Sequence, residues 1–234
     1  MASQKVDFDQ HAENYDAGLG IGLSWTGESR DYFAARRIDW LCKQLKKFGA
    51  APKRVMDFGC GTGSSIPFFF SMLGVESVIA VDGSRKSLEV AKQDYGSERV
   101  QFIPLDEYQP KEPVDLVFCN GVFHHIPLNE RAAAMSLIHD SLRPRGLFAL
   151  WENNPWNPAT HVLMRLAPVD RDAVKLRPAE TQCLLRSSGF DVLQTDFLFI
   201  FPRLFGWFRV IEPYLAQLPF GVQYQVLSTN RPRN

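Results

Sequence analysis

Cysteine is scarce in this 234-residue sequence, and its four cysteines stand far apart without a C-x-x-C pair. That spacing argues against a disulfide framework and against a zinc site, so we expect a protein of a reducing cytoplasm with no bound metal. Net charge is lacking as well, because 26 basic residues balance 26 acidic ones and no extended block of like charge occurs. A nucleic-acid partner is therefore not expected.

Long apolar runs are also missing from the sequence. No segment reaches the length of a membrane-spanning helix, and residues 1–7 show no apolar core followed by a cleavage site. We therefore expect a soluble and unprocessed protein. The length suits one well-buried α/β domain over residues 1–234 and is short for two. Within it we expect a helical cap at 1–50, a ligand-binding core at 53–152, and a further region at 153–234.

Strand and helix patterns alternate along the middle of the chain, as in βαβ units. Apolar strand patterns occur at residues 54–58, 77–81, 100–104, 114–119 and 147–151, followed by 191–201 and an alternating strand near 222–226. Amphipathic or apolar helix patterns occur at 28–48, from about 64, at 84–95, at about 129–142 and near 178–188, and a loop rich in proline and asparagine spans 152–158. The pattern predicts a doubly wound, mostly parallel sheet of seven strands with an antiparallel last strand.

The first strand pattern ends in an acid, Asp57, and opens into a turn with glycine at every second position. These glycines are Gly59, Gly61 and Gly63. Glycine lets the backbone turn sharply and lets a bulky ligand lie against bare peptide groups. A dinucleotide fingerprint needs glycine or alanine where Ser64 stands, and Asp57 would repel a pyrophosphate but suit an ammonium group. An NAD-dependent oxidoreductase is therefore disfavoured.

Polar residues follow the next strands at the edge where an open parallel sheet binds its ligands. They are Asp82, Gly83 and Ser84 after the second strand, Asp106 and Glu107 after the third, and Asn120, Gly121, His124 and His125 after the fourth. Asp82 can accept hydrogen bonds from both hydroxyls of a ribose, and Asp106 can accept one from an adenine amino group. This edge is therefore predicted to bind a nucleoside.

Five sequence blocks resemble, in order and spacing, the class I S-adenosylmethionine-dependent methyltransferases, in particular the small-molecule methyltransferases. The blocks are VMDFGCGTG, AVDGSRKSLEVA, VQFIPLDEY, VDLVFCNGVFHHIP and LRPRGLFALWE, within residues 55–152, and FDQHAENYD at 8–16 looks like the family's N-terminal cap. The resemblance implies a Rossmann-like fold with N-terminal cap helices and a lid after the fifth strand. It implies S-adenosylmethionine as the methyl donor and S-adenosylhomocysteine as the product.

The resemblance also implies roles for the residues of the predicted donor site. It places Gly59, Gly61 and Gly63 along the methionine and ribose part, Asp57 near the amino group, Asp82 at the ribose, Asp106 at the adenine and Asn120 at the midsection, with Tyr15 closing over the donor. Gly83, Ser84, Glu107 and Gly121 are expected at the same site. The alternative is a solvated strand-end acid or helix cap for Asp57 and Asp82, and an ordinary turn residue for Asn120.

Methyl transfer from a sulfonium is an in-line displacement that needs no covalent enzyme intermediate, so positioning does most of the work. A base can remove the proton of the methyl acceptor, and His124 and His125 are candidates because histidine titrates near neutral pH. In related methyltransferases with an acid and histidine pair here, the first position faces the acceptor cavity. We therefore expect His124 at the catalytic site and His125 in structural hydrogen bonding. The alternative is that both stabilise the loop.

Selection of the methyl acceptor is expected in residues 1–48 and 152–220, where no decisive constellation occurs. Glu152, Asn153 and Asn154 either orient an acceptor or satisfy their own loop. The aromatic stretch 197–220 is expected mainly to pack on the sheet and cap. Its alternatives are a lid, a homodimer surface, or a shallow contact with a membrane that holds a lipid-like substrate.

The leading hypothesis is a small-molecule methyltransferase with a natural-product or saccharide-like acceptor. O-, N- and C-methylation all remain open. The alternatives are a noncatalytic subunit that binds S-adenosylmethionine and a methyltransferase that acts on a lipid-like acceptor.

Overall fold

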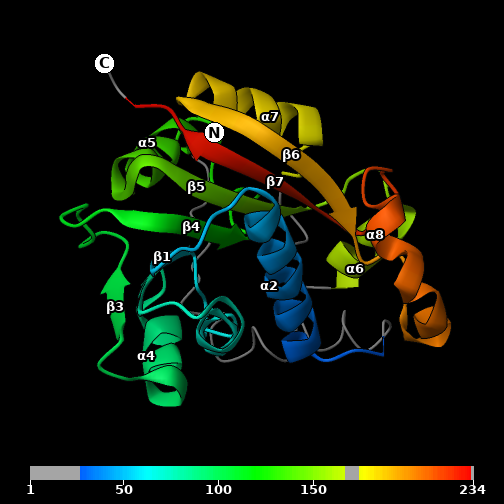
Figure 1. The fold of residues 1–234 in the computed structure, drawn as a ribbon, viewed down its shortest axis with the longest axis horizontal. Coiled ribbons are helices and arrows are strands. Elements are labelled where there is room, and N and C mark those ends of the chain that lie inside the picture. Colours follow the sequence, from blue (N-terminus) through cyan, green and yellow to red (C-terminus); the bar gives the residue numbers. More distant parts are fainter. Residues whose placement is uncertain (1–26, 167–173, 233–234) are drawn as a thin grey trace.

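The computed structural model describes residues 27–166 and 174–232, and a seven-stranded sheet forms its centre (Figure 1). The strands lie in the order β3-β2-β1-β4-β5-β7-β6. Their bounds are β1 Arg54–Phe58, β2 Ser77–Asp82, β3 Val100–Pro104, β4 Val114–Asn120, β5 Leu142–Asn153, β6 Phe190–Leu198 and β7 Gln223–Asn230. Strand β7 runs antiparallel to β5 and β6, whereas the pairs from β3 to β5 are parallel. The expected doubly wound sheet with an antiparallel last strand is confirmed.

Helices cover both faces of this sheet. They are α2 Arg30–Lys47, α3 Ile66–Phe68, a π-helical turn Phe69–Leu73, α4 Arg85–Tyr95, α5 Arg131–Ser141, α6 Pro158–Leu166, α7 Pro178–Ser187, the 3-10 helix η3 Arg203–Ile211 and α8 Glu212–Leu215. Helices α2 and α4 bury Ile38 and Leu88 in one apolar core, and α5 and α7 bury Met135 and Leu185 in the other. Successive strand residues alternate between these two cores.

Helix α2 forms where a polar cap precedes an apolar stripe. The Ser29 hydroxyl accepts a hydrogen bond from the Tyr32 amide at 3.1 Å, which satisfies one of the free donors of the first turn. Ile38, Leu41 and Leu45 lie on one side of the helix and are buried against the sheet. The helix expected in this part of the chain is confirmed, and it leads directly into β1.

Strand β5 is longer than the apolar run at 147–151 that predicted it. Its first residue lies opposite the first residue of β4, and its last residue, Asn153, lies opposite Gln223 of β7. The loop expected from residue 152 therefore begins two residues later. These extra residues are in the strand because they pair with β4 and β7. The apolar pattern of a single strand does not reveal such pairing.

The segments after β5 and β6 differ from the sequence-based expectation. Helix α6 was not expected; Asn157 caps it by accepting a hydrogen bond from the Ala159 amide at 2.8 Å, and Pro158 suits the first helical position. The strand predicted to continue to residue 201 ends at Leu198, because Phe199 adopts a left-handed backbone with φ of 63°.

The aromatic stretch also departs from the expectation that it mainly packs on the sheet and cap. Phe197 and Phe199 are buried, but Leu204 and Trp207 in η3 are exposed. Figure 1 shows η3 and α8 at the same end of the sheet as α6. Among the helices of residues 27–166 and 174–232, none combines the length and apolar character that crossing a bilayer requires.

Candidate functional site

The glycine turn after β1 uses its three glycines for different purposes. A Cβ on Gly59 would lie 2.3 Å from Cγ2 of Val122, so this glycine lets the loop after β4 approach closely. A Cβ on Gly63 would lie 2.9 Å from the Tyr95 ring, so this glycine lets α4 pack against the turn. A Cβ on Gly61 would meet nothing within 4 Å. Of the three, Gly61 therefore presents the open backbone surface that a ligand needs.

Asp82, the last residue of β2, holds the glycine turn in place. Its Oδ2 accepts a hydrogen bond from the Gly61 amide at 2.7 Å, and its Oδ1 accepts one from the Ser84 amide at 2.8 Å. The Ser84 hydroxyl accepts a bond from the Ser87 amide at 3.1 Å and caps α4. Gly83 between them has open space where a Cβ would stand. Asp82 and Ser84 thus shape this edge of the sheet with their own hydrogen bonds.

Asp57 is a buried carboxyl near the end of β1, with 3% of its surface exposed. Burial and the nearby charge of Asp82 raise its pKa to about 8. Both causes disfavour the carboxylate, and a cationic group beside it would reverse the effect. The site is therefore suited to an ammonium group.

The end of β4 adds a second polar feature to this edge. The Asn120 Oδ1 atom is buried and has no hydrogen-bond partner within the described residues. Gly121 follows with a left-handed backbone, φ of 68°, and its amide donates to the Trp151 carbonyl at 2.9 Å. A buried amide oxygen without a donor is costly. Together with the buried Asp57 and the open Gly61, it fits a ligand that carries both an ammonium group and hydrogen-bond donors.

Asp106 and Glu107 lie on the surface after β3 and pair with Arg85 at the start of α4. Arg85 approaches the Asp106 carboxylate at 2.9 Å and the Glu107 carboxylate at 2.8 Å. A contact of Asp106 with an adenine would have to be shared with this arginine. Tyr15 lies outside the described residues.

His124 forms a buried pair with Glu152, the next-to-last residue of β5. The distance from His124 Nδ1 to Glu152 Oε2 is 2.6 Å, and the two side chains are 2% and 1% exposed. The other oxygen of Glu152 accepts a hydrogen bond from the Phe123 amide at 2.9 Å. The ring of His125 lies 4.1 Å from that of His124, centroid to centroid. Glu152 thus holds the His124 ring in place, a partnership that the sequence analysis missed.

Strand register is the signal that points to this pair. Asn120 is paired with Trp151, so Glu152 stands one residue further along the edge, beside the loop that carries His124. Side chains at the carboxyl ends of neighbouring parallel strands lie close together.

Asn153 and Asn154 have partners within the chain. The Asn153 Oδ1 atom accepts from the Gln223 amide group at 3.2 Å. The buried Asn154 donates to the Gly221 carbonyl at 2.7 Å and accepts from the Trp156 amide at 3.1 Å. These bonds fix the loop after β5 to the start of β7, and so support the structural alternative.

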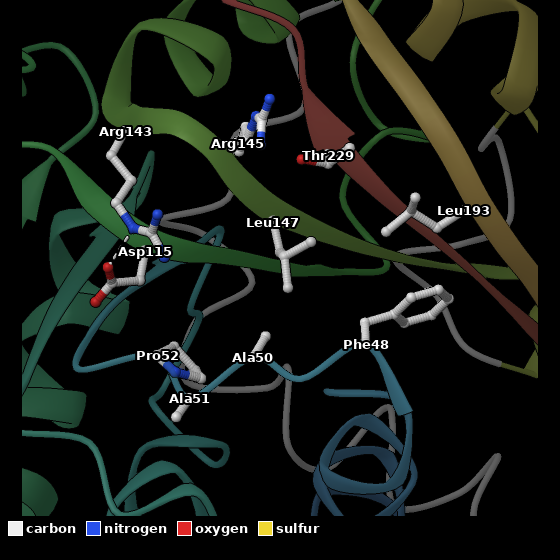
Figure 2. A pocket seen from close by; sticks show the side chains of 10 residues that line it. All are labelled: Phe48, Ala50, Ala51, Pro52, Asp115, Arg143, Arg145, Leu147, Leu193 and Thr229. Atoms are coloured by element: carbon white, nitrogen blue, oxygen red, sulfur yellow. Dashed lines mark hydrogen bonds and ion pairs between the residues drawn. The ribbon is translucent and has the colours of Figure 1, made fainter. Parts of the chain in front are cut away.

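No cluster of three or more metal-binding side chains occurs in the part of the chain that the structure describes. A hollow of about 230 Å³ lies at the edge where β1 and β4 begin, opposite the edge that carries the glycine turn, and Figure 2 shows the side chains that line it. Asp115 and Arg143 pair in its wall at 2.6 Å. The surrounding Phe48 and Leu147 are apolar. This hollow does not belong to the candidate donor site.

Comparison with known proteins agrees with this geometry. Residues 55–146 match a family described as a methyltransferase domain. The trans-aconitate 2-methyltransferase of Rhizobium leguminosarum bv. trifolii is 29% identical over 115 residues, which are 49% of this chain and 44% of that protein. The mRNA cap guanine-N(7) methyltransferase of Caenorhabditis elegans is 27% identical over 175 residues, 63% of this chain and 44% of that protein. The chain thus spans less than half the length of these relatives.

Solved structures share the fold over nearly the whole chain. The magnesium protoporphyrin IX methyltransferase of Synechocystis with bound SAH has a TM-score of 0.63 at 18% identity and covers 97% of each chain. A chain of the complex between the Haloferax volcanii Trm112 methyltransferase activator and a methyltransferase has a TM-score of 0.67 at 18% identity and covers 99% of each. Residues 55–146 thus match a methyltransferase domain, and the sheet order and these solved structures show that the chain has the fold of S-adenosylmethionine-dependent methyltransferases.

Proposed function

We propose that this protein transfers a methyl group from S-adenosylmethionine to an oxygen, nitrogen or carbon nucleophile of a small molecule, with a natural-product or saccharide-like acceptor. The observation that carries the proposal is the buried Asp57 carboxyl, whose pKa is raised to about 8. It stands on the strand next to that of Asn120, whose buried Oδ1 has no donor among the described residues. An ammonium group and a hydrogen-bond donor on one ligand would satisfy both.

Four positions of the chain are assigned to the donor. Asp57 takes the ammonium group, Gly61 offers its open backbone, and Asn120 accepts a hydrogen bond near the middle of the ligand. Asp82 is assigned to the ribose, because its carboxylate stands at the end of β2 and contacts the amide of the open Gly61. Gly59, Gly63 and Ser84 contribute by holding the turn and α4 in position.

When bound, the donor supplies a methyl group that is already activated on a sulfonium. The residues of this chain then hold the methyl acceptor in line, keep water away, and take up a proton where the nucleophile carries one. Precise placement is the largest of these contributions. The edge formed by the ends of β1, β4 and β5 is where this placement is proposed to occur.

His124 is proposed to orient or deprotonate the methyl acceptor. Its Nδ1 lies 2.6 Å from the Glu152 carboxylate, which accepts a hydrogen bond from Nδ1–H and makes Nε2 the basic nitrogen of the ring. The Phe123 amide holds the second oxygen of Glu152, so the carboxylate cannot rotate away. Glu152 is thus a positioning residue, and His125 is assigned to the loop.

The relatives support the donor more strongly than the acceptor. One group is named for trans-aconitate and another for the guanine of an mRNA cap. The matched domain ends at residue 146, before the segments after β5 and β6 that are proposed to select the acceptor. The proposal includes a cytoplasmic location, since all four cysteines are free.

Calorimetry tests the donor site with S-adenosylmethionine, S-adenosylhomocysteine and NAD. Both sulfur nucleosides are expected to bind, NAD is not, and an Asp57→Asn variant should bind the sulfur nucleosides more weakly. Binding of NAD alone would overturn the proposal. A screen of metabolites with a labelled methyl donor then identifies the acceptor. Donor binding without transfer to any acceptor, in a screen that a known methyltransferase passes, would favour a noncatalytic subunit.

A further inference from the structure

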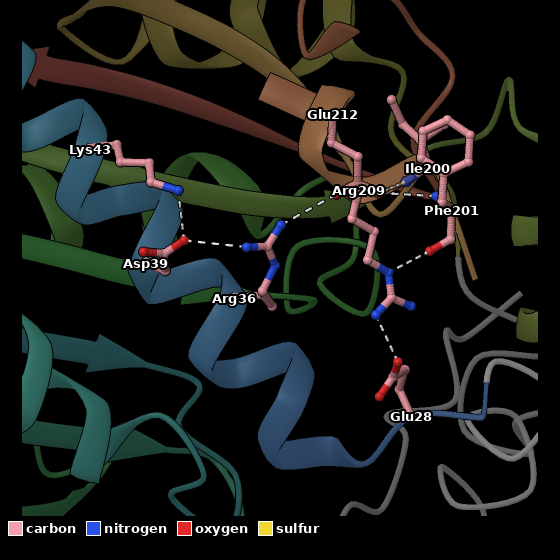
Figure 3. Close-up of polar contacts among 8 residues, drawn as sticks. All are labelled: Glu28, Arg36, Asp39, Lys43, Ile200, Phe201, Arg209 and Glu212. Carbon is pink, nitrogen blue, oxygen red and sulfur yellow. Dashed lines mark hydrogen bonds and ion pairs between the residues drawn. The ribbon is translucent and has the colours of Figure 1, made fainter. Parts of the chain in front are cut away.

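The segment from η3 to α8 turns its one acid inward. Glu212 is buried, and its Oε1 accepts hydrogen bonds from the amides of Ile200 and Phe201, each at 3.0 Å (Figure 3). Its Oε2 lies 3.4 Å from the Arg36 guanidinium of α2. Glu212 therefore fastens the segment to the end of β6 and to α2.

Arg209 is also used to anchor this segment. Its guanidinium donates to the Phe201 carbonyl at 3.0 Å and to Glu28 at 2.8 Å, and lies 4.8 Å from the centre of the Tyr32 ring. Figure 3 shows Arg209 and Glu212 converging on the same turn, with Arg36 continuing to Asp39. The segment is thus held to α2 by its ionic residues.

The outer side of the same segment is apolar. The exposed fractions are 81% for Leu204, 70% for Trp207, 75% for Val210 and 85% for Tyr214. No residue of η3 is buried. An ordinary surface helix buries its apolar side and exposes its charges, so the polarity of this segment is reversed. We call residues 204–220 the apolar surface.

Helix α6 and the residues just before it continue the apolar surface. Trp156 and Val162 are each 52% exposed, and Phe220 is 56% exposed. Asn157 at the start of α6 donates to the Phe220 carbonyl at 2.6 Å, which joins the two segments. They follow the ends of β5 and β6, so the apolar surface borders the sheet edge that carries the glycine turn. An exposed apolar area of this kind marks a binding surface.

The charged residues on and beside the apolar surface indicate which kind of partner it binds. Glu212 is the only acid between residues 197 and 220, and it is buried, so the apolar surface exposes no carboxylate. Arg203 is exposed at its start. A surface with tryptophan, tyrosine and branched aliphatic side chains, a basic residue and no acid fits the interface of an anionic bilayer.

We propose that the apolar surface docks on a phospholipid bilayer that contains anionic lipid. Leu204, Trp207, Val210 and Tyr214 enter the headgroup region, while Arg209 and Glu212 keep the segment attached to α2. The protein lies on the bilayer and does not cross it. Docking brings the edge of the sheet that carries the glycine turn close to the lipid surface. This inference goes beyond the proposed function, because binding to lipid requires neither the donor nor turnover.

Flotation of the full chain with lipid vesicles tests the proposal, without donor or acceptor present. The protein is expected to float with phosphatidylcholine vesicles that contain phosphatidylglycerol, and less with pure phosphatidylcholine. A double variant, Leu204→Ser with Val210→Ser, should weaken the partition at least about tenfold, since two exposed apolar side chains no longer enter the lipid. Leu128→Ser, at a residue 72% exposed elsewhere, is the matched control and should change it less than about twofold.

Two further measurements test whether a second copy of the protein, or another part of the chain, covers the apolar surface instead of lipid. Sedimentation velocity without vesicles is expected to show a monomer; a dimer that Leu204→Ser with Val210→Ser dissolves would overturn the proposal in favour of a second copy. Hydrogen exchange at residues 203–215 should slow only when vesicles are added. If exchange were already slow without vesicles and lipid did not change it, another part of the chain would cover the apolar surface. That result would overturn the proposal. Failure of wild-type flotation would do so directly and leave the proposed methyl transfer untouched.

Discussion

At the scale of single residues, the protonation of Asp57 links pH to both stability and donor binding. Burial and the charge of Asp82 raise its pKa from 3.8 to about 8. Between these values the folded protein keeps a proton on Asp57 that the unfolded chain has lost. The contribution of Asp57 to the free energy of unfolding therefore falls as the pH rises through this window.

A cationic ligand should reverse this protonation. We predict that S-adenosylhomocysteine binds about tenfold more tightly for each pH unit up to about pH 7 and that the gain levels off near pH 8, because its ammonium group requires ionised Asp57. Calorimetry in buffers of different ionisation enthalpy should show one proton released per ligand bound. Asp57→Asn should bind more weakly and lose this pH dependence. A flat pH profile in the wild type would contradict the assignment of Asp57 to the ammonium group.

The pair of Glu152 and His124 gives a second prediction at this scale. Glu152→Gln keeps the side-chain volume and an oxygen for the Phe123 amide, but its amide nitrogen cannot accept a hydrogen bond from His124 Nδ1–H. We predict that the His124 tautomer changes and that turnover falls by about a hundredfold, because Nε2 is then no longer the basic nitrogen that faces the methyl acceptor. Binding of S-adenosylhomocysteine should be unchanged.

Nitrogen chemical shifts of His124 measure the tautomer directly, and single-turnover rates with the identified acceptor measure transfer. Asn153→Ala is a suitable control, because Asn153 is the next residue and its amide oxygen bonds only to Gln223 in the described structure. A normal tautomer and normal turnover in Glu152→Gln would show that the pair only stabilises the loop.

At the scale of elements, two glycines of the same turn are expected to serve different purposes. Gly63 allows the turn to pack, whereas Gly61 contacts the ligand. Gly63→Ala brings a Cβ to 2.9 Å from Tyr95 and 3.1 Å from Ala91, at a φ of 82° that disfavours alanine. We predict that it lowers the free energy of unfolding by about 2–4 kcal/mol. Gly61→Ala meets no atom within 4 Å, so its cost should be near the backbone strain of about 1–2 kcal/mol. It should nevertheless weaken donor binding more than Gly63→Ala does.

Urea unfolding and calorimetry on the two variants check this separation. Measured binding is compared only under conditions where both proteins remain folded. If Gly63→Ala weakened binding more than Gly61→Ala, the open surface at Gly61 would not be the ligand contact.

Helices and strands could be predicted from the sequence where the residues of the element itself, and those at its ends, form the pattern. Strands β1 and β3 have the predicted bounds, because their apolar runs end at glycine, proline or acidic residues. Strand β5 extends beyond its apolar run because partners on β4 and β7 complete it. Helix α6 was missed because its prolines and asparagines, which cap a helix as readily as they form a loop, favoured the loop.

The candidate site shows the same division between local and long-range information. Strand-end residues such as Asp57, Asp82 and Asn120 could be selected because their positions follow from chain order alone. The partnership of His124 with Glu152 depends on register between two strands. The inward position of Glu212, which leaves the apolar surface without an acid, depends on packing against α2. Contacts between residues that lie far apart in the sequence leave no periodic pattern by which they could be predicted.

At the scale of the whole molecule, the chain at the start of α2 touches both the glycine turn and the segment that carries the apolar surface. Arg30 donates a hydrogen bond to the Thr62 hydroxyl in the glycine turn. Glu28, two residues earlier, pairs with Arg209 at 2.8 Å. The candidate donor site and the apolar surface are thus attached to the same short stretch of chain. Loosening the segment should therefore affect the apolar surface first and reach the donor site only through α2.

Removal of the Glu212 carboxylate tests how this attachment supports the surface. Glu212→Ala leaves the Ile200 and Phe201 amides and Arg36 without their partner, so the free energy of unfolding should fall by about 2–4 kcal/mol. Glu212→Gln keeps an oxygen for the two amides and should show a smaller loss, which protects the test if the alanine variant fails to fold. Hydrogen exchange at residues 200–215 should quicken in both variants, and vesicle flotation should weaken in the same order.

Lys43→Ala provides the control for these variants, because Lys43 pairs with Asp39 at the exposed end of the same chain of ion pairs. An exposed pair of this kind contributes about 0–1 kcal/mol, so stability, exchange and flotation should stay close to wild type. If Glu212→Gln left exchange and flotation unchanged while lowering stability, the segment would hold its shape without the inward carboxylate. The reversed polarity of the segment would then follow from its backbone turns at Phe199 and Pro202, and the link through α2 would not be required for lipid binding.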